Sequence, residues 1–247
     1  MSNLFEMTGR VVLVTGGSRG LGHEMVKGFA AQGADVVIAS RKLENCEAVA
    51  REIRALGRRA LAVACNVGRW GELDALVETA YREFGRIDVL VNNAGMSPVA
   101  ATSLDTSEEL FDKVVAVNFK APFRLTALVG SRMVAAGSGS VINITSMAAV
   151  RPEPPFGPYA GAKAALNALT KAFALEYGPK VRVNAIMAGP FWTDVSKSWR
   201  EEAERTSTAA LQRIGRPHEI VTTALYLASE HSTFTTGAVV ELSGGVR

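Results

Sequence analysis

Cysteine, histidine and long apolar runs are scarce in this sequence. Its 247 residues include only Cys46 and Cys65, which form no Cys-x-x-Cys pair, and three histidines. This argues against a disulfide scaffold and gives no zinc-binding spacing, so we expect no metal. No apolar stretch reaches the length of a membrane span, and no basic segment followed by an apolar run opens the chain. We therefore expect a reduced, cytoplasmic protein.

A run of like charge is also absent. The formal net charge is +3, and lysines and arginines are interleaved with acids along the chain. Nucleic-acid and membrane binding use clustered basic residues, so we expect neither partner. Because 48% of the residues are hydrophobic, the chain can bury one large core, and we predict a single domain over residues 1–247.

Short apolar runs rich in β-branched residues alternate with longer amphipathic stretches. The runs predict buried parallel strands at Val11–Val14, Val36–Ala39, Ala60–Ala64, Val89–Val91, Val141–Ile144, Val181–Ile186 and Ala238–Leu242. Helical spacing predicts helices at Leu21–Gln32, Leu43–Leu56, Glu72–Phe84, Ser107–Ala136, Tyr159–Tyr177 and His218–Ala228. Such alternation predicts an α/β fold of the doubly wound, Rossmann type, with ligands at the carboxyl ends of the strands.

A glycine-rich turn joins the first predicted strand to the first predicted helix. Small residues there allow a tight turn and let backbone N–H groups approach a pyrophosphate. The turn predicts a dinucleotide site. Its contacts are expected from Gly16, Ser18, Arg19, Gly20, Leu21 and Gly22.

The end of the second predicted strand indicates which dinucleotide binds. An acid at this place would accept hydrogen bonds from the ribose of NAD, but the residues are Ser40 and Arg41. Arg41, with Arg19, can form charge-assisted bonds to a 2′-phosphate, and Ser40 can add a neutral donor. We predict NADP(H) as cofactor, with NAD(H) as the alternative.

Tyr159 and Lys163 stand four residues apart on one face of a predicted helix. An ammonium in that position can lower the pKa of a phenol, which makes a general acid and base. Ser146, at the end of an apolar run, adds a hydroxyl that can stabilise negative charge on a carbonyl oxygen. A general acid and base, a hydroxyl and a predicted dinucleotide site therefore occur in one chain.

With the glycine turn, Asn92-Asn93-Ala94-Gly95, Asn118, Ser146 and Tyr159-x-x-x-Lys163 in this order, the sequence resembles the short-chain dehydrogenase/reductase family over its whole length. The resemblance implies a seven-stranded parallel sheet and a catalytic tetrad of Asn118, Ser146, Tyr159 and Lys163. It implies that Asn118 ties a water chain to the lysine. It also implies cofactor contacts by Asn66, Val67, Asn93, Ala94, Gly95, Tyr159, Lys163, Gly189 and Thr193, and a homodimer or homotetramer.

Three segments depart from the pattern of that family. Asn66-Val67 stands where the family has Asp-Val, which changes the contact to adenine. Ala188 replaces a proline before Gly189, although Thr193 keeps the position that binds the carboxamide. Ser243-Gly244-Gly245 replaces the commoner Asp-Gly-Gly, which affects a local structural contact.

The substrate is the least determined part of the prediction. Loops after Ser146, Gly95 and Gly189, with a lid over about 190–210, are expected to form an apolar rim. Its members are Met96, Met147, Pro154, Phe156, Phe191, Trp192 and Trp199. We predict a reversible carbonyl reductase, with a 3-oxoacyl thioester reductase as the named possibility. Sugar-acid, polyol and steroid dehydrogenases remain alternatives, as does a non-catalytic dinucleotide sensor on the same fold.

Overall fold

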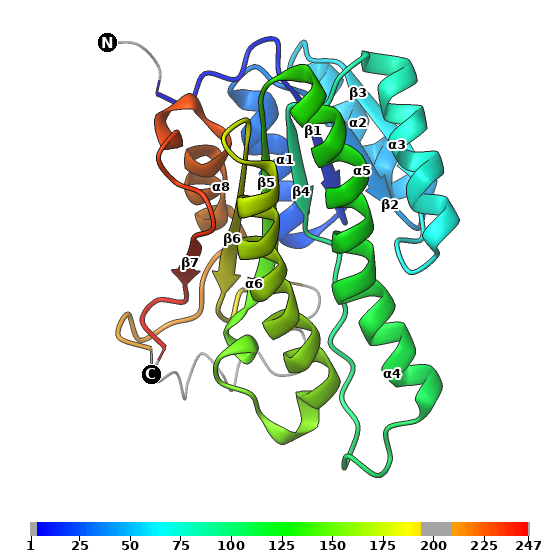
Figure 1. The fold of residues 1–247 in the computed structure, drawn as a ribbon, viewed down its shortest axis with the longest axis vertical. Helices are drawn as coiled ribbons and strands as arrows, with labels where there is room; N and C mark the ends of the chain where they lie inside the picture. Colours follow the sequence, from blue (N-terminus) through cyan, green and yellow to red (C-terminus); the bar gives the residue numbers. More distant parts are fainter. Residues whose placement is uncertain (1–3, 194–208, 247) are drawn as a thin grey trace.

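Seven parallel strands form one sheet in the computed structural model, which describes residues 4–193 and 209–246 (Figure 1). The strands are β1 (Val11–Thr15), β2 (Asp35–Ser40), β3 (Ala60–Ala64), β4 (Val89–Asn92), β5 (Gly139–Ser146), β6 (Val181–Ala188) and β7 (Val239–Leu242). Their order is β3-β2-β1-β4-β5-β6-β7. The predicted doubly wound fold is confirmed, with a topological switch point between β1 and β4.

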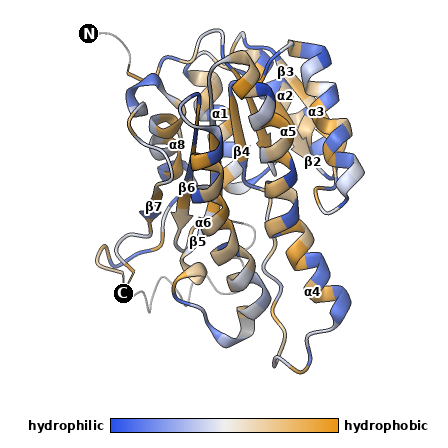
Figure 2. Cartoon of the chain, viewed as in Figure 1, coloured by the Kyte–Doolittle hydropathy of each residue, from blue (hydrophilic) through white to orange (hydrophobic). Residues whose placement is uncertain are grey.

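Helices cover both faces of the sheet. They are α1 (Gly20–Ala31), α2 (Leu43–Ala55), α3 (Trp70–Phe84), α4 (Glu108–Val115), α5 (Ala121–Ala136), α6 (Gly157–Tyr177) and α8 (Val221–Ala228). Single turns of 3-10 helix lie at Met147–Ala149, Pro154–Phe156, Pro217–Ile220 and Glu230–Ser232. α1, α2 and α8 pack against one face, and α3, α5 and α6 against the other. Figure 2 shows apolar strands between helices with polar outer faces.

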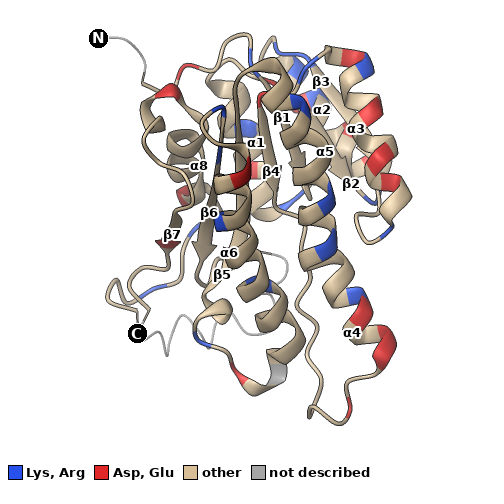
Figure 3. Cartoon of the chain, in the orientation of Figure 1, with Lys and Arg blue, Asp and Glu red and all other residues tan. Residues whose placement is uncertain are grey.

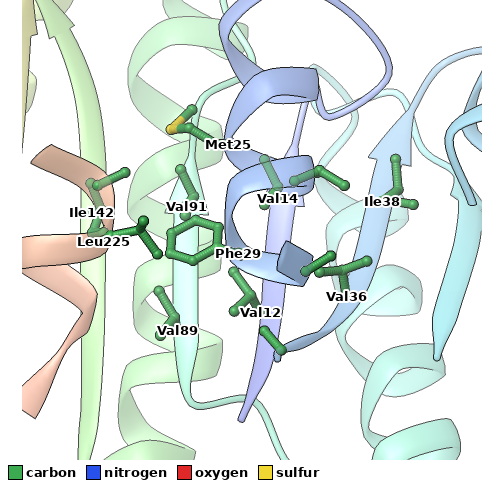
Figure 4. Close-up of a cluster of buried hydrophobic side chains, with 14 of the residues drawn as sticks. Val12, Val14, Met25, Phe29, Val36, Ile38, Val89, Val91, Ile142 and Leu225 are labelled. Carbon is green, nitrogen blue, oxygen red and sulfur yellow. The ribbon is translucent and has the colours of Figure 1, made fainter. Parts of the chain in front are cut away.

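Strand residues alternate between the two apolar cores. On one face, Met25 and Phe29 of α1 lie against Val12 and Val14 of β1 and the valines of β4 (Figure 4). The alternate residues of the same strands face α3, α5 and α6. Because both faces are covered, the central strands read as continuous apolar runs in the sequence. The edge strands differ from the prediction, since most residues of β3 and β7 are only partly buried.

The predicted helix over Ser107–Ala136 is interrupted. α4 begins after Ser107, whose hydroxyl accepts a hydrogen bond from the N–H of Leu110 (3.2 Å). A π-helical turn, η1 (Ala116–Lys120), separates it from α5. Pro122 has no N–H to donate to the carbonyl of Asn118 four residues earlier, so an unbroken α-helix cannot form here. The helical periodicity continues through the turn, which is why the sequence pattern did not reveal it.

Charged residues are dispersed over the surface, as Figure 3 shows. Basic residues of α5 pair with acidic residues of α3: Arg124 contacts Asp74 at 2.8 Å, and Arg132 contacts Glu78. These exposed pairs contribute little stability individually, but they fix the packing of two neighbouring helices. Across residues 4–193 and 209–246, no helix has the length and apolar character that crossing a membrane requires.

Candidate active site

The carboxyl ends of β1 and β4 meet at the switch point and are joined by hydrogen bonds. The buried Thr15 hydroxyl accepts from the N–H groups of Asn93 and Ala94, both at 3.1 Å. The Asn93 amide donates to the carbonyl of Thr15 at 2.8 Å and to that of Gly16 at 3.3 Å. The Asn-Asn-Ala-Gly segment therefore holds the glycine turn in place.

The glycine turn has the shape that close approach of a pyrophosphate requires. Gly16 and Gly20 have φ values of +66° and +55°, which disfavour other L-residues. A Cβ on Gly22 would lie 2.2 Å from the Gly16 carbonyl oxygen and 2.5 Å from Asn93 Nδ2. The bare backbone opens at the N-terminus of α1, where N–H groups and the helix dipole favour an anion. These residues fit a dinucleotide, although the structure carries none.

The side chains at the end of β2 stand beside this turn. The Ser18 hydroxyl donates to the Ser40 hydroxyl at 2.8 Å, which leaves the hydrogen of Ser40 available to a ligand. Arg19 and Arg41 are both exposed. Neither makes an ion pair with a residue that the structure describes. Two cations and a hydroxyl thus flank the expected position of the adenosine ribose.

The side-chain oxygen of Asn66 is hydrogen-bonded within its own loop. Asn66 Oδ1 accepts from the N–H of Gly68 at 3.1 Å, and its N–H donates to Glu72 at 2.6 Å. Val67 is buried beside it. The amide N–H₂ of Asn66 remains to contact a base, whereas an aspartate in this position would offer only acceptors.

Ser146 and Tyr159 come together at the carboxyl end of β5 and the start of α6. A hydrogen bond with Ser146 lowers the pKa of the Tyr159 phenol, but burial has the larger effect and raises it. The sequence predicted that Lys163 would lower this pKa, but burial has the largest effect on it. The Lys163 ammonium lies 5.8 Å from the centre of the tyrosine ring. Tyr159 is therefore a neutral phenol at neutral pH.

Lys163 is buried, and no acid neighbours it among residues 4–193 and 209–246. Its side chain is 3% exposed, and Nζ donates to the carbonyl of Ile144 at 2.8 Å. Burial lowers the pKa of Lys163 from 10.5 to about 8. A lysine in this state exchanges protons near physiological pH, which is the property expected of a proton-relay group.

Asn118 is fully buried in the π-helical turn. Its amide donates to the carbonyls of Met96 (2.8 Å) and Val114 (3.0 Å), and Oδ1 accepts from the N–H of Met96 at 3.3 Å. These bonds fix the orientation of the amide. A Cβ placed on Gly95 would touch both Asn118 Oδ1 and Lys163 Nζ, so the structure brings these predicted residues to one place.

The loop after β6, which carries Gly189 and Thr193, is described only in part. Gly189 donates to the carbonyl of Leu242 at 2.9 Å, and the Thr193 side chain stands above Gly20. Of the predicted rim, Met147 and Phe191 are buried, which indicates packing. Met96, Phe156 and Trp192 are partly buried and Pro154 is exposed. Trp199 and most of the predicted lid over about 190–210 lie outside the described residues.

Sequence reasoning missed a buried polar ladder beneath the site. Asn92 Nδ2 donates to Thr126 (3.0 Å) and to Asn143 Oδ1 (2.8 Å), and Asn143 Nδ2 donates to Thr170 at 2.9 Å. The ladder joins α5, β4, β5 and α6. The available signal was an asparagine inside the apolar run Val141–Ile144, where a polar residue requires a buried partner.

Residues 10–204 match the model of a protein family described as short chain dehydrogenase. The chain belongs to the short-chain dehydrogenase/reductase family. Dehydrogenase/reductase SDR family member 4 of Homo sapiens is 34% identical over 244 residues, which are 97% of this chain and 88% of that protein. The 3-oxoacyl-[acyl-carrier-protein] reductase of Thermotoga maritima is 34% identical over 243 residues, or 97% and 98% of the two chains.

Solved structures of this family superpose closely on the chain. A 7α-hydroxysteroid dehydrogenase in complex with NADH and 7-oxo glycochenodeoxycholic acid gives a TM-score of 0.94 at 32% identity, over 100% of this chain and 98% of the other. A Beutenbergia cavernae protein with NADP bound at low occupancy gives 0.93 at 32% identity, over 98% of each chain. Members of the family therefore bind either dinucleotide.

Proposed function

We propose that this short-chain dehydrogenase/reductase is an NADP(H)-dependent enzyme that reversibly reduces a ketone or 3-oxoacyl group to a secondary alcohol. The observation that carries the proposal is the meeting of Ser146, Tyr159 and Lys163 at the carboxyl ends of the central strands, beside a glycine turn shaped for a dinucleotide. A bound nicotinamide dinucleotide supplies the hydride.

The chain's own residues handle the charge and the proton. The Ser146 hydroxyl donates a hydrogen bond to the carbonyl oxygen as negative charge develops on it. The Tyr159 phenol gives that oxygen its proton, and burial keeps the phenol protonated at neutral pH. The protonated phenol is the form that reduction requires, and oxidation of the alcohol gains rate as the pH rises toward the pKa of the phenol.

A panel of ketones, acyl thioesters, sugar acids and steroids, followed by nicotinamide absorbance, tests the activity. Tyr159→Phe should lower kcat by about a thousandfold and leave nucleotide affinity within about twofold, because only the proton donor is lost. Turnover that survives this substitution would remove Tyr159 from the mechanism. Nucleotide binding without turnover on any substrate would favour the non-catalytic sensor.

The preference for NADP(H) is supported by Arg19, Arg41 and Ser40, which can surround a 2′-phosphate. Arg41→Asp should reverse the ratio of kcat/KM for NADPH and NADH, since a carboxylate repels the phosphate and accepts bonds from a ribose. The control is Arg51→Asp, which makes the same change of charge at an exposed arginine within α2. Equal efficiency of the wild type with both cofactors would contradict the assignment.

Three substrate classes have support of their own. The relative from Thermotoga maritima favours a 3-oxoacyl thioester, and the hydroxysteroid dehydrogenase structure favours a bulky ketone. The Beutenbergia cavernae structure, described as a gluconate 5-dehydrogenase, favours a sugar acid. The substrate panel separates them by kcat/KM. A sugar acid or polyol would require a more polar rim. The described rim includes the aromatic side chains of Phe156 and Trp192, which are partly buried.

We also propose a single-domain protein that forms homodimers or homotetramers through α5 and α6. Phe123 is 40% exposed, and Leu175 is 86% exposed. Phe123 also contacts Phe173 with ring centres 5.6 Å apart. Exposed apolar residues on neighbouring helices suit a second copy. Light scattering should give two or four chains, and a monomer would contradict the proposal. Cys46 and Cys65 are free thiols, which favours the cytoplasm.

A further inference from the structure

The C-terminal segment Ser243–Val246 turns back beside the loops that follow β5 and β6. Gly244 and Gly245 have φ values of +70° and +76°, which other L-residues rarely adopt. The Ser243 hydroxyl accepts from the N–H groups of Gly245 and Val246, both at 3.2 Å. Because these N–H groups are bonded within the turn, the carbonyls of residues 244–246 are left to accept from other parts of the chain.

The first two of these carbonyls hold the residues that lead toward α8. Those of Gly244 and Gly245 accept from the N–H groups of Leu211 and Ala210, both at 3.0 Å. A Cβ on Gly189, in the loop after β6, would lie 2.7 Å from the first Cα of the C-terminal segment. The C-terminal segment therefore lies between the loop after β6 and the residues before α8, in contact with both.

Arg151 connects the same segment to the loop that follows the proposed catalytic serine. Its Nη1 donates to the carbonyl of Val246 at 2.5 Å, across 95 positions of the sequence. Its backbone N–H donates to the carbonyl of Met147 at 2.8 Å, and Met147 is buried directly after Ser146. A surface arginine usually extends into water, whereas this one is hydrogen-bonded at both its backbone and its guanidinium.

We propose that Arg151 is a positioning residue that holds the loop after Ser146 against the C-terminal segment and thereby fixes the substrate end of the cleft. The inference rests on the proposed oxidoreductase function. Phe156 and Trp192 of the proposed rim follow the two loops that meet at the C-terminal segment. The link through Arg151 therefore sets how these loops stand relative to each other. The glycine turn is held separately, by the Thr15 hydroxyl at the switch point.

The first test measures steady-state kinetics with the best substrate of the panel. Arg151→Ala should raise KM about tenfold, with kcat within about threefold and nucleotide Kd within about twofold of the wild type, because only substrate binding is loosened. Arg151→Lys keeps a donor on a flexible stem and should bring KM within about threefold of the wild type. A wild-type KM in Arg151→Ala would overturn the proposal, as would a lysine variant with the KM of the alanine variant.

Arg54→Ala is the matched control for these kinetics. Arg54 is another exposed arginine that donates to a backbone carbonyl, that of Ala60 at 2.7 Å. Ala60 begins β3, so this bond lies at the amino end of a strand, away from the cleft. We expect Arg54→Ala to leave KM unchanged. A rise in KM equal to that of Arg151→Ala would contradict the proposal.

The second test needs no turnover and follows amide hydrogen exchange by mass spectrometry in the protein without nucleotide. Arg151→Ala should raise exchange about fivefold at Val150 and at residues 210–211, whose N–H groups are bonded at the two places that the arginine joins. Gly245→Ala would place a Cβ 2.9 Å from that of Ala210 and should also raise exchange at Val150, across the link. Gly71→Ala, at an exposed position with open space around it, is the control.

The double variant of Arg151→Ala and Gly245→Ala completes this test. Both substitutions act on one link, so exchange at Val150 in the double variant should stay within about twofold of the larger single effect. Wild-type exchange at Val150 in both single variants, or effects that multiply in the double variant, would overturn the proposal. If the wild type turns over no substrate, the proposed function fails, whereas the exchange comparison still decides whether Arg151 joins the two segments.

Discussion

The cofactor side and the catalytic side of the cleft satisfy their polar groups differently. On the cofactor side, the hydroxyl of Thr15 and the amide of Asn93 make a closed set of short hydrogen bonds to backbone groups. On the catalytic side, Lys163 is a buried ammonium that no acid of the described segments accompanies. Asn92 Oδ1 and Thr145 Oγ1 also lack a hydrogen-bond partner in the part of the chain that the structure describes.

This difference shows which part of the site is stabilising. Backbone hydrogen bonds rigidify the cofactor side and contribute to the stability of the fold. A buried, unpaired ammonium destabilises the folded state, and it is retained where a proton must move. Substitutions on the cofactor side should therefore reduce stability and nucleotide affinity together, whereas removing the lysine should increase stability and abolish turnover.

Gly22→Ala should have the largest effect on the cofactor side. Its Cβ would collide with the carbonyl oxygen of Gly16, a backbone atom that cannot move without displacing the turn. We expect nucleotide affinity to fall at least about thirtyfold and the free energy of unfolding by about 3 kcal/mol. Calorimetry and denaturant unfolding measure the two quantities, with Gly71→Ala as control. An affinity unchanged from the wild type would show that the turn does not hold the nucleotide.

Thr15→Val tests whether the hydrogen-bonded set is stabilising. Valine keeps the volume of threonine but removes the hydroxyl that accepts from the N–H groups of Asn93 and Ala94. The N–H of Asn93 keeps the carbonyl of Val91 as an acceptor at 3.1 Å, so the N–H of Ala94 is the group that loses its partner. An unpaired donor costs about 1–3 kcal/mol, so a loss of about 2 kcal/mol in unfolding free energy is expected. Denaturant unfolding measures this loss. An unfolding free energy equal to that of the wild type would contradict the view that the hydrogen bonds of the cofactor side stabilise the fold.

Lys163→Met should stabilise the protein. The unfolded chain, with a lysine pKa near 10.5, holds a proton between pH 8 and 10.5 that the folded protein has released. Wild-type stability therefore rises with pH across this window, and the full penalty for burying the ammonium is present below pH 8. We expect Lys163→Met to gain about 2 kcal/mol at pH 7, less at pH 9.5, and to lose turnover. Destabilisation at pH 7 would mean that the Ile144 hydrogen bond outweighs burial.

The sequence was sufficient for the fold and for most of the proposed site, because those features depend on local patterns. Apolar runs predicted all seven strands, and glycine spacing predicted the turn whose shape the structure shows. Tyr159 and Lys163 share a helix face because four residues make about one turn. These arguments need no knowledge of which elements are neighbours.

The remaining features depend on distant partners. Whether a strand lies at an edge is decided by the sheet order, so the partial exposure of β3 and β7 could not be read from their own residues. The direction in which the pKa of Tyr159 is shifted depends on how burial compares with the hydrogen bond to Ser146, and both come from the three-dimensional packing. Asn143 finds its partner Thr170 through the packing of α6 on β5.

Thr170→Val gives the smallest expected effect and is the matched counterpart of Thr15→Val. The Thr170 hydroxyl accepts from Asn143 Nδ2 and donates to the carbonyl of Leu166 on its own helix. Valine leaves a side-chain donor of Asn143 unpaired, whereas Thr15→Val leaves a backbone donor unpaired, and we expect a loss of about 1 kcal/mol in unfolding free energy. Because α6 also carries Tyr159 and Lys163, kcat should fall more than nucleotide affinity does. Equal losses of affinity in the two valine variants would show that the two sides of the cleft are one cooperative unit.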